Sequence, residues 1–196
     1  MSTTELLVLS LVCSFLFGIS FVLIHLLRKD LKFSQVALSE YALGKYDWVL
    51  TIGLYAVGVA QVTLALALVQ QPGPASIGHL LLIAGGAGAW AVAAFETETL
   101  KRTSREYLHE LGALIQFACF PAALWFMRGT FDNTLLNNLT TFVAITSSIL
   151  LFVIVYKQAH KLTNRPSEDF GLVQKTNIIL MYAWLVAIPL YFLQIL

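Results

Sequence analysis

The sequence predicts an all-α protein, a polytopic membrane bundle of six transmembrane helices with both termini outside. Three observations support this prediction: an apolar composition, six long apolar segments and an uneven distribution of basic residues. Of the 196 residues, 58% are hydrophobic and only 12% are charged, and the mean hydropathy is +0.78. Soluble domains carry roughly 25% charged residues. The composition therefore places the chain among membrane proteins before any motif is considered.

Six segments are long and apolar enough to cross a bilayer, which requires about 20 mostly apolar residues. These predicted spans cover residues 5–27, 48–69, 77–95, 109–127, 134–156 and 173–196. Short polar loops separate them, so residues 1–196 are expected to form one six-span domain. The first run is longer than the core of a signal peptide, about 7–15 residues, and no Lys or Arg precedes it. We expect it to be a retained span.

Polar and small residues distinguish the individual spans. Span one carries His25 near its inner end, and span two carries Gln61 near its middle. Span three is rich in small residues from Ala84 to Ala89. Because small residues let helix backbones approach closely in lipid, we expect this span to lie centrally and to pack on two or more neighbours.

Span four begins with His109, and Gln116 follows on the same helical face. Pro121 and Pro189 interrupt spans four and six, where the loss of a backbone donor predicts a bend. Polar groups at membrane depth usually face the bundle interior and find partners there. Hydrogen bonding between helices is therefore the default interpretation of these histidines and glutamines, a binding site is the alternative, and the sequence leaves both interpretations open.

The orientation follows from the basic residues, because Lys and Arg accumulate in cytoplasmic loops. Among the 12 Lys and Arg residues, only Arg128 lies on the side of the termini. The others follow spans one, three and five: Arg28, Lys29, Lys32, Lys45, Lys101, Arg102, Arg105, Lys157, Lys161, Arg165 and Lys175. Loops 28–47, 96–108 and 157–172 are therefore predicted to be cytoplasmic.

Charge and motifs exclude several functions. A net charge of +1 gives no concentrated basic surface for nucleic acid. The pair Glu106 and His109 matches only one half of a di-iron carboxylate site, which needs a second Glu-x-x-His, so we expect no metal and no cofactor. No nucleophile elbow or phosphate-binding loop is present, and no catalytic residue is predicted. Cys13 and Cys119 lie inside apolar runs and are expected to be small buried hydrophobes.

The first loop, residues 28–47, holds the best candidates for a site. Its polar stretch lies between two apolar runs, and its Ser, Glu and Tyr share a predicted membrane depth with residues at the ends of spans one, three and four. Histidine titrates near neutral pH, so such a group could hold a cation, relay protons or bind a polar head group. The predicted ligand-binding residues are Ser39, Glu40, Tyr41, Glu96, His109, His25 and Gln116.

Several motifs resemble those of a prokaryotic membrane family, the domain of unknown function 998. They are Leu26–Asp30, Ser39–Gly44 with Trp48, Phe95–Glu98, His109 with Gly112-Ala113, and Gly171–Lys175. In that family a Ser-x-Tyr element lies between the first two of six spans, and a Phe-Pro-Thr-Asp element follows span three, where this chain has no proline. The resemblance implies six spans in a prokaryotic cytoplasmic membrane. It implies no activity.

Three functions remain open from the sequence. The first is a membrane protein that binds, and in one version moves, a small polar or amphiphilic molecule through a site on its cytoplasmic half. The second is an accessory or structural subunit that docks onto another membrane protein through surfaces rich in Trp90, Trp125, Phe126 and Trp184. The third is a lipid-modifying intramembrane enzyme that uses His109 with Glu96 or Glu106 as acid and base. The lipid bilayer is the expected partner in all three.

Overall fold

Six long helices make up the protein in the computed structural model, which describes residues 1–71, 76–95, 104–161 and 169–194. The helices are α1 (Thr3–Leu27), α2 (Asp47–Val69), α3 (Ile77–Ala94), α4 (Ser104–Met127), α5 (Thr134–Lys161) and α6 (Phe170–Phe192). A short 3-10 helix, η1 (Leu38–Ala42), lies in the first loop. All six α-helices are long and apolar enough to cross a membrane, which confirms the predicted all-α, six-span fold.

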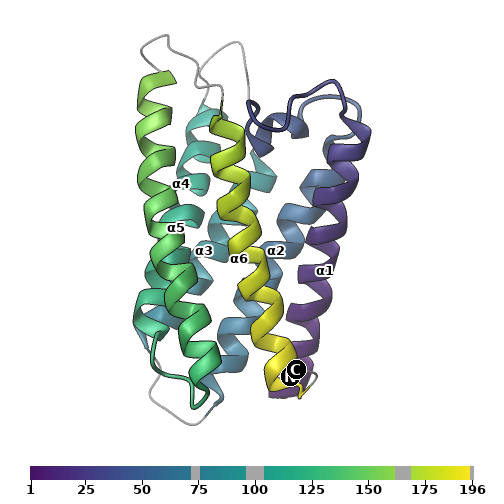
Figure 1. Cartoon of the computed structure of the whole chain (residues 1–196). Coiled ribbons are helices and arrows are strands. Elements are labelled where there is room, and N and C mark those ends of the chain that lie inside the picture. Colours follow the sequence, from purple (N-terminus) through teal and green to yellow (C-terminus); the bar gives the residue numbers. More distant parts are fainter. Residues whose placement is uncertain (72–75, 96–103, 162–168, 195–196) are drawn as a thin grey trace.

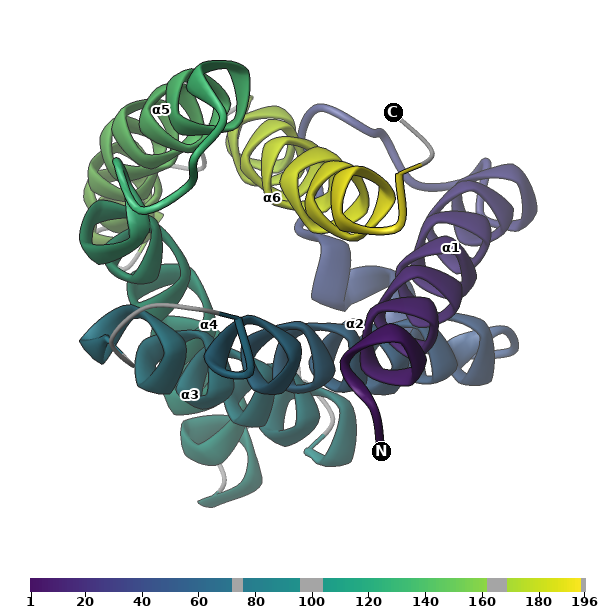
Figure 2. The same cartoon turned by 90° about the horizontal axis from the view of Figure 1, so that it is seen from below.

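The helices run up and down between two ends of a bundle (Figure 1). The start of α1 and the end of α6 lie at one end, and the first loop lies at the other, which we call the first-loop end. In the view along the bundle, α2, α3 and α4 form one wall and α5 and α6 lie opposite, with α1 beside α2 and α6 (Figure 2). The two termini therefore share one side, and which side of a membrane that is remains a prediction.

Three helices extend beyond their predicted spans at the first-loop end. Helix α4 begins at Ser104 instead of 109, α5 continues to Lys161 instead of 156, and α6 begins at Phe170 instead of 173. The additional helical residues therefore take up part of the predicted loops 96–108 and 157–172. Hydropathy locates only the part of a helix inside the hydrocarbon, whereas a helix continues into its polar end turns. The first turn of α4 carries Glu106, where a carboxylate interacts favourably with the helix dipole.

Helix α3 packs closely on two neighbours through its glycines, as predicted. A Cβ at Gly86 would lie 2.7 Å from the carbonyl oxygen of Gly58 in α2. A Cβ at Gly88 would lie 2.7 Å from the carbonyl oxygen of Gly112 in α4. Real side chains do not tolerate such distances, so the backbones of α2, α3 and α4 can approach this closely only with glycine at these positions.

Trp184 lies in the core, which corrects its predicted place on a docking surface. Its side chain is fully buried, and its indole Nε1 donates a hydrogen bond to Thr140 Oγ1 of α5 at 3.0 Å. The ring meets Phe120 of α4 edge-on, with centroids 5.7 Å apart. Of the predicted set, only Trp125 and Phe126 are exposed, at 37% and 53%. Hydropathy marks Trp184 as apolar, but only the packing of α4, α5 and α6 determines that it faces inward.

Candidate functional site

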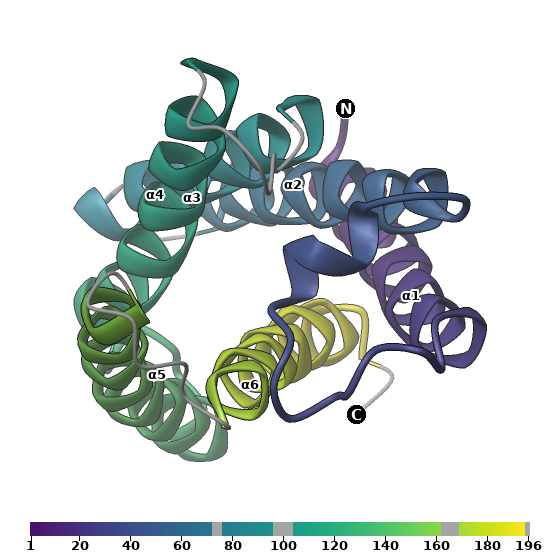
Figure 3. The ribbon, with the colours of Figure 1, turned by 90° about the horizontal axis from the view of Figure 1, so that it is seen from above.

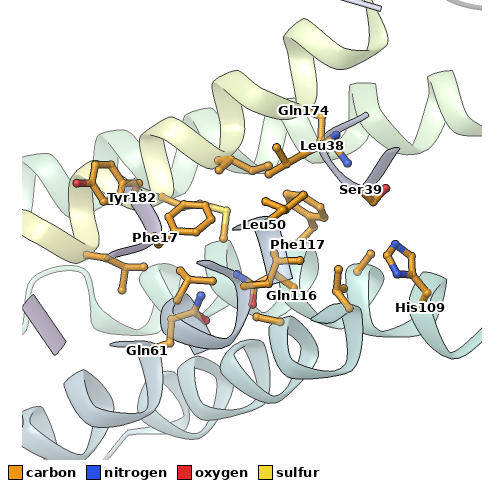
Figure 4. A pocket seen from close by; sticks show the side chains of 18 residues that line it. Phe17, Leu38, Ser39, Leu50, Gln61, His109, Gln116, Phe117, Gln174 and Tyr182 are labelled. Carbon is orange, nitrogen blue, oxygen red and sulfur yellow. The ribbon is translucent and has the colours of Figure 1, made fainter. Parts of the chain in front are cut away.

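Two adjoining cavities lie among the helices in the half of the bundle nearer the first loop. The inner cavity, with a volume of about 70 Å³, lies among α1, α2, α3, α4, α6 and η1 (Figure 4). The outer cavity, of about 450 Å³, lies among η1, α4, α5 and α6. The two share the lining residues Ser39, His109, Ala113, Phe117 and Gln174. These five residues form the boundary between the cavities.

The inner cavity is mainly apolar and contains two glutamines. Gln61 of α2 is fully buried, and neither its amide oxygen nor its amide nitrogen has a hydrogen-bond partner among the described residues. The side-chain oxygen of Gln116 in α4 is also buried without a partner. A Cβ at Gly85 would lie 2.8 Å from Gln61 Oε1 and 3.5 Å from Gln116 Oε1. Gly85 of α3 therefore leaves the space that the amide of Gln61 occupies.

The outer cavity carries the charged groups. Its lining includes Glu40 of η1 and Glu106 and Glu110 of α4, with Gln158 of α5. Glu106 and Glu110 are four residues apart and therefore lie on the same face of the helix. The described residues around this cavity include no Lys or Arg. In the described ranges, no three His, Cys, Asp or Glu side chains lie together as metal ligands would. The carboxylates therefore come from η1 and from one face of α4.

His109 lies at the boundary between the two cavities. Its side chain is 7% exposed, and its Nδ1 lies 2.6 Å from the carbonyl oxygen of Phe95 at the end of α3. Since a carbonyl oxygen only accepts, Nδ1 donates this bond and carries the proton. The contact fixes the orientation of the imidazole and joins the start of α4 to the end of α3.

The first loop closes the bundle by docking on the start of α6 (Figure 3). Lys175 is fully buried, and its Nζ donates to the carbonyl oxygens of Phe33 and Val36, both at 2.7 Å. The same ammonium lies 4.5 Å from the ring centre of Phe33 and 4.6 Å from that of Tyr41, within cation–π range. This arrangement, the Lys175 anchor, holds the loop over the cavities.

Two further contacts reinforce the anchor. The backbone N–H of Leu172 donates to the carbonyl oxygen of Ser34 at 2.9 Å. The N–H of Leu38 at the start of η1 donates to Gln174 Oε1 at 2.8 Å. Gly171 makes this approach possible, because a Cβ there would overlap the backbone of Val36. The first loop is therefore held by groups that are about 140 residues away in the sequence.

The structure divides the predicted site residues into two groups. Ser39 lines both cavities, Glu40 lines the outer one and Gln116 the inner one. Tyr41 lies instead in the anchor, because a 3-10 helix has three residues per turn and adjacent side chains point in different directions. Burial raises the pKa of the Tyr41 phenol, so the ring stays neutral beside Lys175.

His25 also lies outside the cavities. Its ring contacts those of Phe21 and Tyr41, with centroids 4.5 Å apart in each case, and that of Phe33 at 5.0 Å. Its Nδ1 donates to the carbonyl oxygen of Phe21 at 2.6 Å. His25 therefore supports the anchor from α1. Glu96, the remaining predicted site residue, lies outside the described residues.

Sequence reasoning missed Gln174 and misplaced Lys175. Lys175 was counted among the loop residues, but it lies in the second turn of α6 and is buried. A signal was available, because a charged residue within an apolar span is rare and needs a partner or a function. Gln174 could not be distinguished from an ordinary interfacial glutamine, because its partner, the N–H of Leu38, belongs to the first loop.

Comparison with known families gives one match. The family described as "Protein of unknown function (DUF998)" matches residues 11–190. The chain belongs to this family. The match covers all six helices, with parts of α1 and α6 outside it, and confirms the resemblance stated from the sequence motifs. No curated protein and no solved structure matches the chain. The chain is thus an integral membrane protein of a family without an assigned activity.

Proposed function

We propose that the protein binds a small amphiphilic molecule in the two cavities, with the polar head in the outer cavity and the apolar part in the inner one. The observation that carries the proposal is the contrast between the adjoining cavities. The outer one has three carboxylates in a lining that is otherwise mostly apolar, the inner one has none, and five lining residues are common to both. A ligand with one polar and one apolar end matches this order.

The charges favour a cationic head group. Three carboxylate side chains, Glu40, Glu106 and Glu110, line the outer cavity, and Glu40 also lies near the buried ammonium of Lys175. Carboxylates in a cavity with walls of low dielectric constant attract cations. From Glu106 to Gln116 the α4 helix rises about 15 Å, which is the length available to the ligand. Ser39, His109 and Gln174 supply hydrogen-bonding groups at the boundary.

The proposal also includes an orientation. All basic residues except Arg128 lie in or near the connections at the first-loop end, counted along the sequence, and such residues accumulate on the cytoplasmic side. The outer cavity then faces the cytoplasmic half of the membrane. A ligand reaches it from the cytoplasm or from the inner leaflet of the bilayer.

The test is to block the boundary between the cavities. Ala113 lines both of them, so Ala113→Trp places a large ring between head and tail. The probe is a medium-chain alkylamine with a diazirine on its chain, added to the full chain in lipid nanodiscs. We expect photolabelling of η1, α4 and α6 in the wild type and its loss in Ala113→Trp.

The matched control is Leu111→Trp, because Leu111 lies on α4 but is 51% exposed and lines neither cavity. This variant should keep the wild-type labelling. Equal labelling of cavity residues in wild type and Ala113→Trp would contradict the proposal, as would labelling confined to side chains that face the lipid.

A further inference from the structure

The amide of Gln61 is a buried polar group that the packing of the bundle leaves unpaired. Its side chain is fully buried in α2, and within the part of the chain that the structure describes both of its amide atoms lack a hydrogen-bond partner. It lines the inner cavity, together with Gln116, whose side-chain oxygen is also unpartnered (Figure 4). An unsatisfied buried donor or acceptor destabilises the folded protein. A glutamine that served only stability would be expected to pair with a neighbouring helix, as Trp184 does with Thr140.

The position of the two amides defines what could pair with them. Both side-chain oxygens lie near Gly85, at which a Cβ would be 2.8 Å from one and 3.5 Å from the other. A partner must donate to at least one of these oxygens and accept from the Gln61 amide nitrogen. A hydroxyl or a secondary amide does both. An ammonium group cannot accept and a carboxylate cannot donate. Exchanging the oxygen and nitrogen of Gln61 leaves the same requirement, because the amide still presents one acceptor and one donor group.

The cavity is large enough for more than a water molecule. A single water needs about 10–15 Å³ on this measure, and the inner cavity has about 70 Å³. Most of its remaining lining is apolar, including Leu50, Leu54 and Met181. The free space therefore has a mostly apolar wall and one polar region, the glutamine amides, that can both donate and accept a hydrogen bond.

We propose that Gln61 and Gln116 recognise an uncharged hydroxyl or amide group at the inner end of the ligand. This inference rests on the proposed function and narrows its ligand to an amphiphile with two polar points, a head group in the outer cavity and an uncharged hydrogen-bonding group at the end of its apolar part. A simple alkyl chain fits the cavity but leaves both glutamines unpaired.

Two photoactivatable probes test this inference. One is the diazirine alkylamine described above, and the other is the same molecule with a terminal hydroxyl group. In the wild-type chain in nanodiscs, each probe is tested for its ability to displace the other from the inner cavity. We expect the hydroxyl probe to do so at about tenfold lower concentration than the alkylamine, which is the effect of roughly one net hydrogen bond. In Gln61→Leu this preference should disappear or reverse.

The matched control is Gln35→Leu, since Gln35 is exposed in the first loop and lines neither cavity; it should keep the preference. Gln61→Met provides a second, unbranched replacement if Gln61→Leu does not fold, and the comparison of the two probes on the wild type needs no variant.

Equal competition by both probes, or a preference that survives in the Gln61 variants, would overturn the inference and leave water as the partner of the glutamines. If Ala113→Trp still blocks both probes in that case, the proposed function stands. If neither probe labels the cavities, both proposals fail.

Discussion

The Lys175 anchor and the inner cavity both bury polar side chains completely, but they treat them in opposite ways. In the anchor, the ammonium of Lys175 has two carbonyl oxygens and two aromatic rings around it. In the inner cavity, Gln61 has no partner for either amide atom. Lys175 and Gln61 are equally inaccessible, since both side chains are 0% exposed. The difference between them is hydrogen bonding.

This comparison separates a structural polar group from a candidate binding group. A buried cation that has hydrogen-bond partners stabilises the contact between the segments it joins. Removing the cation leaves those partners unpaired. An unsatisfied amide costs stability in the empty protein, and a ligand that pairs with it gains the corresponding free energy. In this bundle, burial by itself therefore does not identify a site. The informative observation is burial without a partner next to a cavity.

The largest expected effect comes from removing the ammonium of the anchor. Lys175→Met keeps the length of the side chain but leaves the carbonyl oxygens of Phe33 and Val36 without their donor. We expect a loss of about 3 kcal/mol in the free energy of unfolding. A titration with denaturing detergent, followed by circular dichroism, measures it. Lys32→Met is the control, because Lys32 is exposed in the same loop; equal losses in both variants would contradict the special role of Lys175.

A smaller effect is expected from forcing the first loop away from α6 without changing any charge. The methyl group of Gly171→Ala overlaps the backbone of Val36 and would lie 2.9 Å from the carbonyl oxygen of Phe33. Overpacking of this kind costs about 1–3 kcal/mol, and we expect about 2 kcal/mol here. The loop should also become a better substrate for trypsin at Lys29 and Lys32. Leu172→Ala, at an exposed neighbour, should leave the cleavage rate unchanged, and wild-type cleavage in Gly171→Ala would show that the loop is not held by this contact.

The smallest expected effect is a change in the free energy of unfolding whose sign distinguishes Gln61 from Gln174. Gln61 and Gln174 both line the inner cavity, but only Gln174 has a partner in the structure, the N–H of Leu38. Gln174→Leu should lower the free energy of unfolding by about 1 kcal/mol, because a hydrogen bond is lost. Gln61→Leu should leave it unchanged or raise it by about 1 kcal/mol, because an unpaired amide is removed. The same detergent titration compares the two variants, and a clear destabilisation by Gln61→Leu would mean that its amide is paired in the folded protein.

The sequence predicted the elements of the fold because their signals are local. A run of about 20 apolar residues identifies a span wherever it packs, and all six predicted spans are helices in the structure. The glycines of α3 also predicted close packing on two neighbours, since small side chains permit it whatever the partner. The ends of α4, α5 and α6 were missed because polar residues continue these helices beyond the apolar run.

The candidate site was predicted less well because it depends on contacts between distant segments. Ser39, Glu40 and Tyr41 are consecutive in the sequence, yet η1 turns Ser39 and Glu40 toward the cavities and Tyr41 toward Lys175. Local pattern could not reveal this division, because it depends on where α6 meets the loop.

The sequence by itself determined that this chain spans a membrane six times and belongs to its family, and it identified the first loop as the segment most worth attention. The tertiary structure alone decided which polar groups are satisfied. The partners of Lys175 lie 139 and 142 residues away, and the buried amide of Gln61 has room only because residue 85 of a neighbouring helix is a glycine. Hydrophobicity and helix periodicity are properties of neighbouring residues, whereas hydrogen-bond satisfaction in a bundle is a property of helices brought together by folding.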